Sequence, residues 1–593
     1  MVDIVKKPGD ILTEKIRHTT AHVLALAVKR LYPEVKFGIG PAVENGFYYD
    51  FEFPKEIREE DLVAIENEMR KIQNSGLPIV SKKMKREDAI DFFKKFNQRY
   101  KLDLISEIPD KELEFYEIGD GEFVDLCRGE HVDNTSKIGA FKLVGVAGAY
   151  WKGDSNEQML QRIYGYSFQT EKELTAYIEL QTRIKQLDHR ILGKQLGLFS
   201  FDEFSAGYLL WYQRGLKLRN KLTEFIRAGY SDSKFIEIQT PEVLTRDYLT
   251  SSEYSKSYFN QLYLVKTITD TDYEYYLRPR NNIGAIEYIK SRQYSYKELP
   301  TGIVEVGTVH RNETSGELHG LFRTREFTMD DAHTLCDENS VKNEVISIIN
   351  KIKVVYKQFN LEADIIQIVT VDTESISKDS PIDKKEIDGS EAILRQALKE
   401  CGISYKESSS EHEIFAPKIE FYVNDISGKP WQCGTIQVDF AQPRILEIKF
   451  TNEKGEKQNA VLVYSTIFGS LERFLGLILE RYEGKLPLWL APEQVRIVPI
   501  SDEFNEYGQN VLLNLTDRGI DASLDDRAET MQNKIREAEL LKVPYVAVVG
   551  EKEQKFNTVA VRPCGKSDMG MTDLTEFIKL LKEEIKQRKN AEQ

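Results

Sequence analysis

Residues 305–333, EVGTVHRNETSGELHGLFRTREFTMDDAH, form the stretch around which the rest of the chain is organised. Apolar and polar residues alternate up to a polar corner at residues 311–313, and a second apolar run returns to His333. Thr314, Ser315 and Gly316 lie between the two runs and favour a turn. The pattern therefore predicts a β-hairpin with a long loop.

Three arginines, Arg311, Arg323 and Arg325, lie near the predicted strand ends. A guanidinium group is planar and binds phosphate oxygens in pairs, so such a cluster suits a polyphosphate. A surface hairpin can carry the same charges as exposed salt bridges, which contribute little stability. The residues alone leave both interpretations open.

The composition predicts several domains in a reducing compartment. The chain has 593 residues, of which 41% are hydrophobic and 30% are charged, enough for sizeable cores. No apolar run reaches the length of a membrane span, and the N-terminus lacks a signal peptide's apolar core. Five scattered cysteines form no disulfide framework and favour the cytoplasm. The net charge of -15 argues against a general nucleic-acid coat but leaves local basic patches open, such as residues 82–86.

A helix is predicted over residues 17–32 from the spacing of its apolar residues, with Pro33 just past its end. His18 and His22 are four residues apart, so both project from one face of this helix.

Cys127 and His131 show a second four-residue spacing, with Asp125 close by. Together with the two helix histidines they permit three interpretations: buried core residues, a tetrahedral zinc site, or a hydrolytic site that orients water.

Two further segments have a clear pattern. Residues 171–196 have apolar helical spacing and charge pairs four residues apart, which predicts one connecting helix. Residues 491–593 alternate strand and helix patterns, which predicts an α/β domain with a mainly parallel sheet.

The central stretch resembles motif 2 of class II aminoacyl-tRNA synthetases, specifically the threonyl-tRNA synthetases. The resemblance lies in the R-N-E corner at residues 311–313 and in FRTREFTMDDAH at residues 322–333. Residues 235–249 resemble motif 1, a strand that forms the dimer interface in that class, although an ordinary edge strand would also suit Pro241. Residues 466–482 resemble motif 3, with Ser470 as the expected helix N-cap.

The resemblance implies a class II catalytic domain with an antiparallel sheet at residues 199–490. Its partners would be ATP with Mg²⁺, an amino acid and tRNA, in a homodimer. No Gly-Lys phosphate loop occurs, so arginines and magnesium would hold the phosphates. The implied catalytic residues are Arg311, Lys418 and Arg473, and the implied ATP contacts are Arg311, Glu313, Arg323, Gln432, Gln437 and Arg473.

Residues 1–170 resemble the α+β editing domain of bacterial threonyl-tRNA synthetases, and we expect no extra domain before them. That domain hydrolyses serine mischarged onto tRNA without a metal, whereas a related alanine-type domain binds zinc. The family usually has proline where this chain has Glu130, and the extra carboxylate would raise the pKa of the adjacent histidine or disturb the water. The implied editing residues are His18, His22, Asp125, Cys127 and His131.

The implied amino-acid pocket departs from the family. Threonyl enzymes hold zinc through one cysteine and two histidines, and these positions are Asn282, His333 and Tyr464 here. An amide and a phenol are poor zinc ligands, so we expect no tight zinc site. Glutamine and tyrosine of the family become Met329 and Phe415, while Asp331 is retained. We therefore expect poor discrimination of threonine from valine, or preference for a different amino acid.

The C-terminal domain, residues 491–593, resembles the anticodon-binding domain of class II synthetases, and residues 171–198 form the helical linker before the catalytic domain. The implied anticodon contacts are Arg536, Glu553 and Arg562, whereas Ala528 replaces an expected asparagine. The preferred hypothesis is a threonine–tRNA ligase that proofreads seryl-tRNA. The alternatives are a paralogue that activates another amino acid and a tRNA-binding or trans-editing protein without ligase activity.

Overall fold

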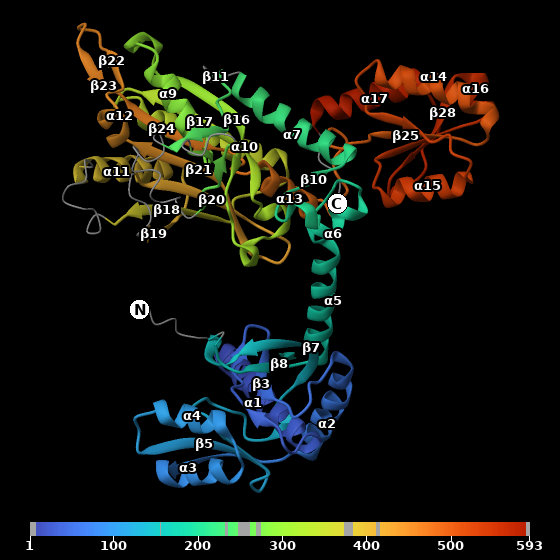
Figure 1. Cartoon of the computed structure of the whole chain (residues 1–593). Coiled ribbons are helices and arrows are strands. Elements are labelled where there is room, and N and C mark those ends of the chain that lie inside the picture. Colours follow the sequence, from blue (N-terminus) through green and yellow to red (C-terminus); the bar gives the residue numbers. More distant parts are fainter. Residues whose placement is uncertain are drawn as a thin grey trace. The chain divides into compact units, whose positions relative to one another are not determined.

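The computed structural model describes residues 8–154, 156–231, 235–246, 261–268, 274–372, 383–410 and 416–588. It consists of two compact units, Met1–Arg183 and Ile184–Gln593, which we describe separately (Figure 1). No helix in the described part of the chain is long and apolar enough to cross a membrane.

The first unit is built on helix α1 (Pro8–Leu31), which confirms the predicted histidine helix. Residues 21 and 23–28 are completely buried and pack against α2 (Leu62–Ser75) and β3 (Gly46–Glu52). The main sheet has the order β1-β3-β8-β7, with β2 paired to β3, and a second sheet has the order β4-β5-β6. Their bounds are β1 Lys36–Phe37, β2 Ala42–Val43, β4 Ile79–Lys85, β5 Glu112–Ile118, β6 Phe123–Leu126, β7 Ala140–Tyr150 and β8 Met159–Phe168, with α3 (Arg86–Lys95) and α4 (Arg99–Glu107) beside the second sheet.

The predicted single connecting helix is wrong, because it divides into α5 (Glu171–Leu187) and α6 (His189–Gln195). Asp188 is non-helical and its side chain accepts the Arg190 backbone N–H at 2.8 Å, capping α6. His189 is completely buried, and its ring nitrogens lie 2.7 Å from Glu480 Oε1 and 3.0 Å from the Leu321 backbone nitrogen. These contacts with distant residues hold α6 in place after the break.

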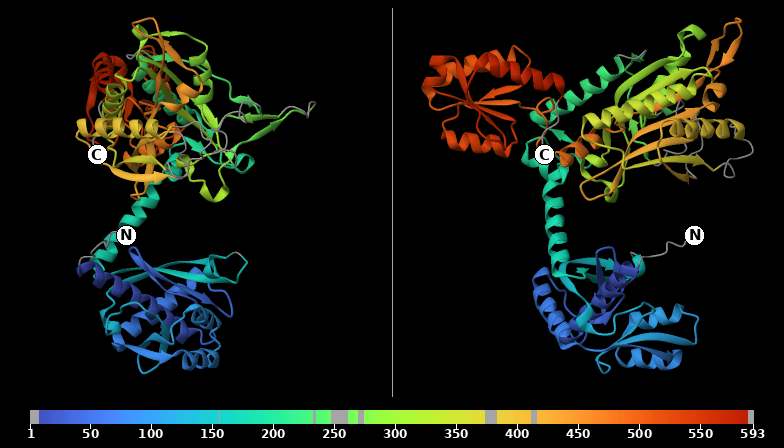
Figure 2. Two further views of the ribbon diagram at one scale, coloured as in Figure 1. Left: turned by 90° about the vertical axis from the view of Figure 1, so that its left-hand side faces the viewer. Right: turned by 180° about the vertical axis from the view of Figure 1, so that it is seen from behind.

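The second unit contains an eight-stranded sheet with the order β11-β16-β17-β24-β21-β20-β18-β19. Its central pairings, from β16 to β18, are antiparallel, which confirms the predicted sheet type, and the two edge pairings are parallel. Helices α10 (Val341–Gln358) and α11 (Lys384–Glu400) contact each other and the sheet (Figure 2). The strand bounds are β11 Phe235–Glu237, β16 Thr301–His310, β17 Glu326–Cys336, β18 Ile365–Val371, β19 Lys406–Ser410, β20 Lys418–Asn424, β21 Pro430–Asp439 and β24 Val461–Thr466.

Strands β16 and β17 form the predicted long-loop hairpin. Their register pairs Glu305 with Asp331 and Ile303 with His333, and the backbone N–H of Arg311 donates to the Arg325 carbonyl at 2.9 Å. Strand β24 flanks β17 and brings Tyr464 opposite His333. Motif 1 contributes the edge strand β11, and residues 247–249 of that motif lie outside the described residues.

The C-terminal part confirms the predicted α/β pattern but not the mainly parallel sheet. The order is β26-β25-β27-β28-β29, with two parallel and two antiparallel pairings. A parallel return needs a crossover of a dozen or more residues, and only residues 550–557 connect β27 to β28. The bounds are β25 Val495–Pro499, α14 Asn505–Thr516, β26 Ala522–Leu524, α15 Met531–Leu540, β27 Tyr545–Val549, α16 Glu551–Phe556, β28 Thr558–Pro563, β29 Gly570–Asp573 and α17 Leu574–Gln587.

Candidate active site and editing cluster

A cleft of the second unit is lined by Arg311 of the hairpin and Arg473 of motif 3. Arg311 follows β16 and donates through Nε to the Pro279 carbonyl at 3.2 Å, with its guanidinium 5.0 Å from the centre of the Phe327 ring. Burial and the nearby Arg280 guanidinium lower the pKa of Arg311 to about 10. Arg311 is therefore a cation held in place by backbone and ring contacts.

Arg323 is oriented by two carboxylates. It reaches Glu313 at 2.8 Å and Glu317 at 3.0 Å, and Glu313 is buried. The predicted ATP contact Glu313 thus engages an arginine in this structure and positions it at the corner of the hairpin loop.

Arg473 lies in the first turn of α13 (Leu471–Arg481), whose N-cap is Ser470, as predicted. Its side chain donates to the carbonyls of Phe322 at 2.9 Å and Gln432 at 2.7 Å. Burial lowers the pKa of Arg473, and the like charges of Arg311 and Arg323 lower it further. Motifs 2 and 3 therefore bring three arginines into one electrostatic group.

Asp330 joins these two motifs and was missed by the sequence analysis. Its buried carboxylate accepts the backbone N–H groups of Ile467 at 2.7 Å, Phe468 at 3.1 Å and Gly469 at 2.9 Å. The only sequence signal was the adjacent pair of aspartates in the hairpin return. The contact fixes the turn that leads into α13.

Lys418 on β20 and Gln432 on β21 both contact the carboxylate of Glu420. Lys418 Nζ lies 3.0 Å from Glu420 Oε1, and the Gln432 side-chain amide donates to the same oxygen at 2.9 Å. Gln437 donates to the Ala416 carbonyl at 2.9 Å. All the predicted catalytic residues and ATP contacts except Glu313 and Arg323 line the cleft itself.

The lining of this cleft contains four cations and no carboxylate. Such a surface attracts a polyanion, because no acidic group of the lining offsets the positive charge. The lining residues are Arg280, Arg311, Phe327, Met329, Lys418, Gln432, Cys433, Thr435, Gln437, Tyr464, Thr466, Gly469, Ser470 and Arg473.

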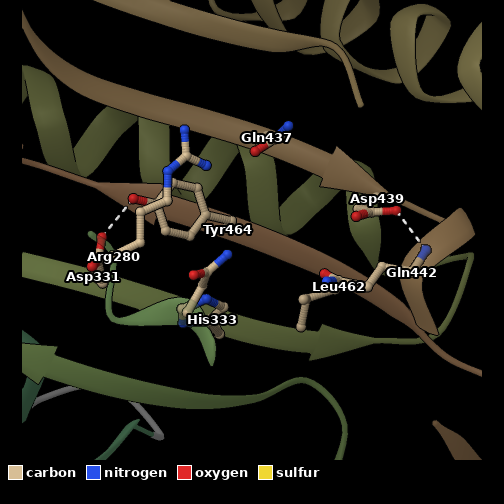
Figure 3. A pocket seen from close by; sticks show the side chains of 9 residues that line it. Arg280, Asp331, His333, Gln437, Asp439, Gln442, Leu462 and Tyr464 are labelled. Carbon is tan, nitrogen blue, oxygen red and sulfur yellow. Dashed lines mark hydrogen bonds between the residues drawn. The ribbon is translucent and has the colours of Figure 1, made fainter. Parts of the chain in front are cut away.

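A smaller pocket adjoins the cleft and shares Arg280, Gln437 and Tyr464 with it. The Tyr464 hydroxyl donates to Asp331 Oδ1 at 2.5 Å (Figure 3). Burial raises the pKa of Asp331, although this hydrogen bond opposes the rise. The remaining lining residues are Asn282, Asp331, His333, Asp439, Gln442 and Leu462.

Two polar atoms of this pocket are buried without a hydrogen-bond partner among the described residues. They are Asp331 Oδ2 and His333 Nδ1, on side chains only 1% and 2% exposed. Burial lowers the pKa of His333 to about 4, so its imidazole is neutral near pH 7. Polar atoms buried in this way favour a ligand that supplies the missing partners.

The residues of the pocket do not fit zinc. Asn282, His333 and Tyr464 do line it together, as the resemblance implied. Only His333 is a favourable ligand, since Tyr464 keeps its proton and donates it to Asp331. Among the described residues, the groups of three or more His, Cys, Asp or Glu with metal-ligand spacing lie elsewhere. Met329 lines the larger cleft, and Phe415 lies outside the described residues.

The predicted editing residues come together in the first unit, on α1, within β6 and just after β6. Cys127 Sγ lies 3.4 Å from His18 Nε2 and 3.3 Å from His131 Nε2. His22 Nε2 lies 3.7 Å from Asp125 Oδ2, which also accepts the Tyr49 hydroxyl at 2.5 Å. His18, His22, Cys127 and His131 have the spacing of a metal-binding group, and one thiolate with three imidazoles would suit zinc.

Proton positions in this cluster follow from Thr19. Its hydroxyl donates to the Lys15 carbonyl at 2.7 Å, and it accepts from the Val132 N–H at 3.1 Å. Thr19 therefore also accepts from His131 Nδ1 at 3.1 Å, which leaves His131 Nε2 as the acceptor facing Cys127.

The cluster is neutral at pH 7. Burial lowers the pKa values of His18, His22 and His131. Burial also raises the pKa of Cys127 to about 12, so the thiol stays protonated and is a weak nucleophile. Neutral imidazoles can accept a proton from water, which is the chemistry of a general base.

The expected rise in the pKa of His131 next to Glu130 is wrong, while the alternative that Glu130 disturbs the water stays a prediction. The Glu130 carboxylate is exposed and lies 2.8 Å from Lys15 Nζ, whereas the pKa of His131 is lowered. Lys15, Glu130 and His18 line the surface cavity next to the cluster. The extra carboxylate thus forms a salt bridge at the mouth of this cavity.

The predicted anticodon contacts lie on three elements of the C-terminal part. Arg536 is exposed on α15, Glu553 is half-buried on α16, and Arg562 is exposed on β28. Arg562 Nε lies 3.2 Å from Asp568, and Glu553 raises the pKa of the nearby Tyr507 together with burial.

Family models match three parts of the chain. They are the threonyl and alanyl tRNA synthetase second additional domain at residues 113–164, the tRNA synthetase class II core domain (G, H, P, S and T) at residues 263–482, and the anticodon binding domain at residues 494–584. The threonine–tRNA ligase of Clostridioides difficile strain 630 is 43% identical over 578 residues, covering 97% of this chain and 89% of that protein. The threonine–tRNA ligase of Clostridium novyi strain NT is 42% identical over 579 residues, covering 98% and 89%. This chain belongs to the threonine–tRNA ligase family.

One solved structure agrees with this assignment, and a second shares the fold. The structure described as the RNA binding domain of threonyl-tRNA synthetase from Cryptosporidium parvum Iowa II has a TM-score of 0.62 at 32% identity, covering 67% of this chain and 98% of that one. A putative threonyl-tRNA synthetase from Aeropyrum pernix shares the fold, with a TM-score of 0.58 at 24% identity and coverage of 68% and 97%. This member of the ligase family is an aminoacyl-tRNA ligase with a class II core, an anticodon-binding domain and an editing domain.

Proposed function

We propose that this ligase attaches threonine to tRNA in two steps, using ATP with Mg²⁺, and removes serine attached in error. The observation that carries the proposal is the cleft with four cations and no lining carboxylate, which suits a triphosphate beside an amino-acid carboxylate. The alternative of a tRNA-binding protein without ligase activity would not need such a cleft.

In the proposed first step the threonine carboxylate attacks the α-phosphate of ATP, and pyrophosphate leaves. Arg311 would neutralise charge on the α-phosphate, and Arg473 would hold the outer phosphates together with Arg323. Lys418, fixed by Glu420 at 3.0 Å, would face the adenylate. Preorganised cations of this kind stabilise developing charge without reorganising at the moment of reaction. Gln432 and Gln437 would contact the nucleotide.

The test of the ligase proposal is amino-acid-dependent exchange of labelled pyrophosphate into ATP, measured with all twenty amino acids. We expect exchange with threonine, followed by transfer to tRNA. Exchange with another amino acid alone would favour a paralogue, and no exchange at all would favour a tRNA-binding protein.

For editing, we propose that the neutral histidines orient and deprotonate a water that attacks the ester of seryl-tRNA. Cys127, protonated at neutral pH, would donate to His131 Nε2 rather than attack. Deacylation of purified seryl-tRNA by the full chain tests this proposal, with threonyl-tRNA as the comparison substrate.

Three further parts of the proposal rest mainly on the family. Arg536, Glu553 and Arg562 would contact the anticodon, and the chain would act as a homodimer through motif 1. Five free cysteines support a reducing, cytoplasmic location. Sedimentation of the purified protein tests the homodimer.

A further inference from the structure

We propose that Arg280 takes the place of a metal ion in the amino-acid pocket, and that Arg280 and Asp331 together recognise the hydroxyl group of threonine. This inference rests on the proposed threonine activation and deepens it. It names a residue that determines specificity and a chemistry for the pocket that needs no zinc.

The first observation is the position of Arg280. Its side chain lines both the polyanion cleft and the adjoining pocket, and it is the only cation in the pocket's lining (Figure 3). Its charge acts on Asp331, where it lowers the pKa of the carboxyl group, and on the pKa of Tyr464. The Arg280 guanidinium therefore supplies a positive charge to the pocket that is lined by Asn282, His333 and Tyr464, which do not suit a metal ion.

The second observation is the unpaired acceptor. Asp331 Oδ1 already accepts from the Tyr464 hydroxyl, and the Asn281 backbone N–H also lowers the pKa of this carboxyl group. Asp331 Oδ2 is nevertheless buried and has no partner at hydrogen-bond distance and angle among the described residues. A ligand that places a donor on Oδ2 would remove this deficit.

A hydroxyl group fits both observations. It carries one donor and two acceptor lone pairs, so it can donate to Asp331 Oδ2 and accept from a guanidinium N–H of Arg280. The methyl group of valine at the same position would do neither, and it would leave the carboxylate oxygen unpaired. A site built to hydrogen-bond a hydroxyl rejects the analogue without it much more strongly than a shape-matched apolar pocket does.

The presence of Arg280 in the pocket alters the selectivity expected from the sequence. Loss of the metal ligands predicted weak discrimination between threonine and valine or preference for a different amino acid, because only Asp331 and His333 were expected to contact a hydroxyl. With Arg280 and Asp331 acting together, the pocket should discriminate sharply without zinc. A pocket with a guanidinium could instead take an acidic side chain, and the experiment includes that outcome.

The experiment measures pyrophosphate exchange by the full chain after dialysis against a chelator, with zinc counted by elemental analysis. Threonine, valine, serine and aspartate are compared in the wild type and in Arg280→Met, Arg280→Lys and Asp331→Asn. Arg292→Met is the matched control, because Arg292 is exposed and pairs with Glu298 at 3.8 Å. Thermal unfolding of each variant shows that it is folded.

We expect the zinc-free wild type to exchange with threonine, at a kcat/KM roughly 10²-fold or more above that for valine. Arg280→Met should raise the KM for threonine at least tenfold without raising the KM for ATP, and Arg280→Lys should lose less because it keeps the cation. Asp331→Asn should reduce the preference for threonine over valine.

Loss of exchange on chelation with recovery on added zinc would overturn the inference while the proposed function stands. Normal threonine kinetics in both folded Arg280 variants would do the same. A wild-type preference for aspartate would overturn both the inference and the assignment of threonine as the substrate, and it would favour the paralogue. If the wild type and Arg292→Met both show no threonine-dependent exchange, the proposed function itself fails, and the inference fails with it.

Discussion

At the scale of single residues, the sequence predicted which charged side chains would gather but not all the contacts that hold them. Arg311, Lys418 and Arg473 were placed by motif resemblance, and they line one cleft. The roles of Arg280 and Asp330 were not predicted, because each depends on residues distant in the sequence. Asp330 accepts hydrogen bonds from the turn at residues 467–469, and the charge of Arg280 acts on Asp331 and Tyr464.

Arg311→Ala tests the role of the cleft cations. Arg311 points into a cleft without lining carboxylates, so its loss should remove charge stabilisation that no other group replaces. We expect threonine-dependent pyrophosphate exchange to fall by about 3–4 kcal/mol in kcat/KM, comparable to removal of an oxyanion-hole donor. Arg292→Ala serves as the exposed control, and equal activity of the two variants would contradict the assignment.

Asp330→Ala tests the link between motifs 2 and 3. The substitution would leave three buried backbone N–H groups of residues 467–469 without their acceptor. Each such group costs roughly 1–3 kcal/mol, so we expect destabilisation of at least ~3 kcal/mol in denaturant unfolding. Asp526→Ala, at an exposed position, should change stability little. A variant as stable as the wild type would show that water satisfies these groups.

At the scale of elements, the sequence pattern predicted those helices and strands whose ends are set by neighbouring residues in the chain. Helix α1 ends before Pro33, Ser470 caps α13, and the β16–β17 hairpin has its predicted long loop. The break at Asp188 was not predicted, because the buried contact of His189 with Glu480 stabilises it and leaves no periodic signal. The mixed C-terminal sheet was missed because strand patterns do not reveal that the connection after β27 is too short for a parallel return.

Removal of metal tests whether the editing cluster on α1 and after β6 works without a metal ion. Helix α1 and the turn after β6 bring four potential ligands together, yet the thiol is protonated at neutral pH in the absence of a metal. We expect seryl-tRNA deacylation by the full chain to survive dialysis against a chelator. Loss of activity that returns with zinc would identify a metal site at this cluster.

The buried histidines of this cluster also make the first unit sensitive to acid. Burial lowers the pKa of His22 in the folded state, so below its unfolded pKa of about 6.5 the unfolded chain binds a proton that the folded chain excludes. Stability is therefore complete above that pH and is lost as the pH falls, with a slope approaching ~1.4 kcal/mol per pH unit for His22.

Hydrogen exchange of α1 in the full chain, corrected for intrinsic rates, should show falling protection from pH 7 to pH 5. His22→Gln removes one of the three buried histidines and should make this dependence less steep, while His18 and His131 still contribute to it. Equal slopes for the wild type and the variant would contradict the shifted pKa.

At the scale of the whole molecule, two sites in two separate units would together select threonine over similar amino acids. The pocket of the second unit can recognise a hydroxyl through Asp331 and Arg280, but serine carries the same hydroxyl as threonine. Only the missing methyl group distinguishes serine, and one methyl is worth about 1–3 kcal/mol, or roughly 10–200-fold. On this proposal valine would be excluded at activation, whereas serine would have to be removed after transfer.

The last prediction follows from this division of work. A His22→Ala variant keeps the second unit intact, so its threonine- and serine-dependent pyrophosphate exchange should match the wild type. Incubated with tRNA, serine and ATP, it should accumulate seryl-tRNA, whereas the wild type should not. With valine in place of serine, neither protein should accumulate valyl-tRNA. Arg473→Ala provides the reciprocal control, since it should lose activation but still deacylate added seryl-tRNA. If the His22 variant leaves no seryl-tRNA although it activates serine, hydrolysis occurs elsewhere, and the cluster on α1 is not the editing site.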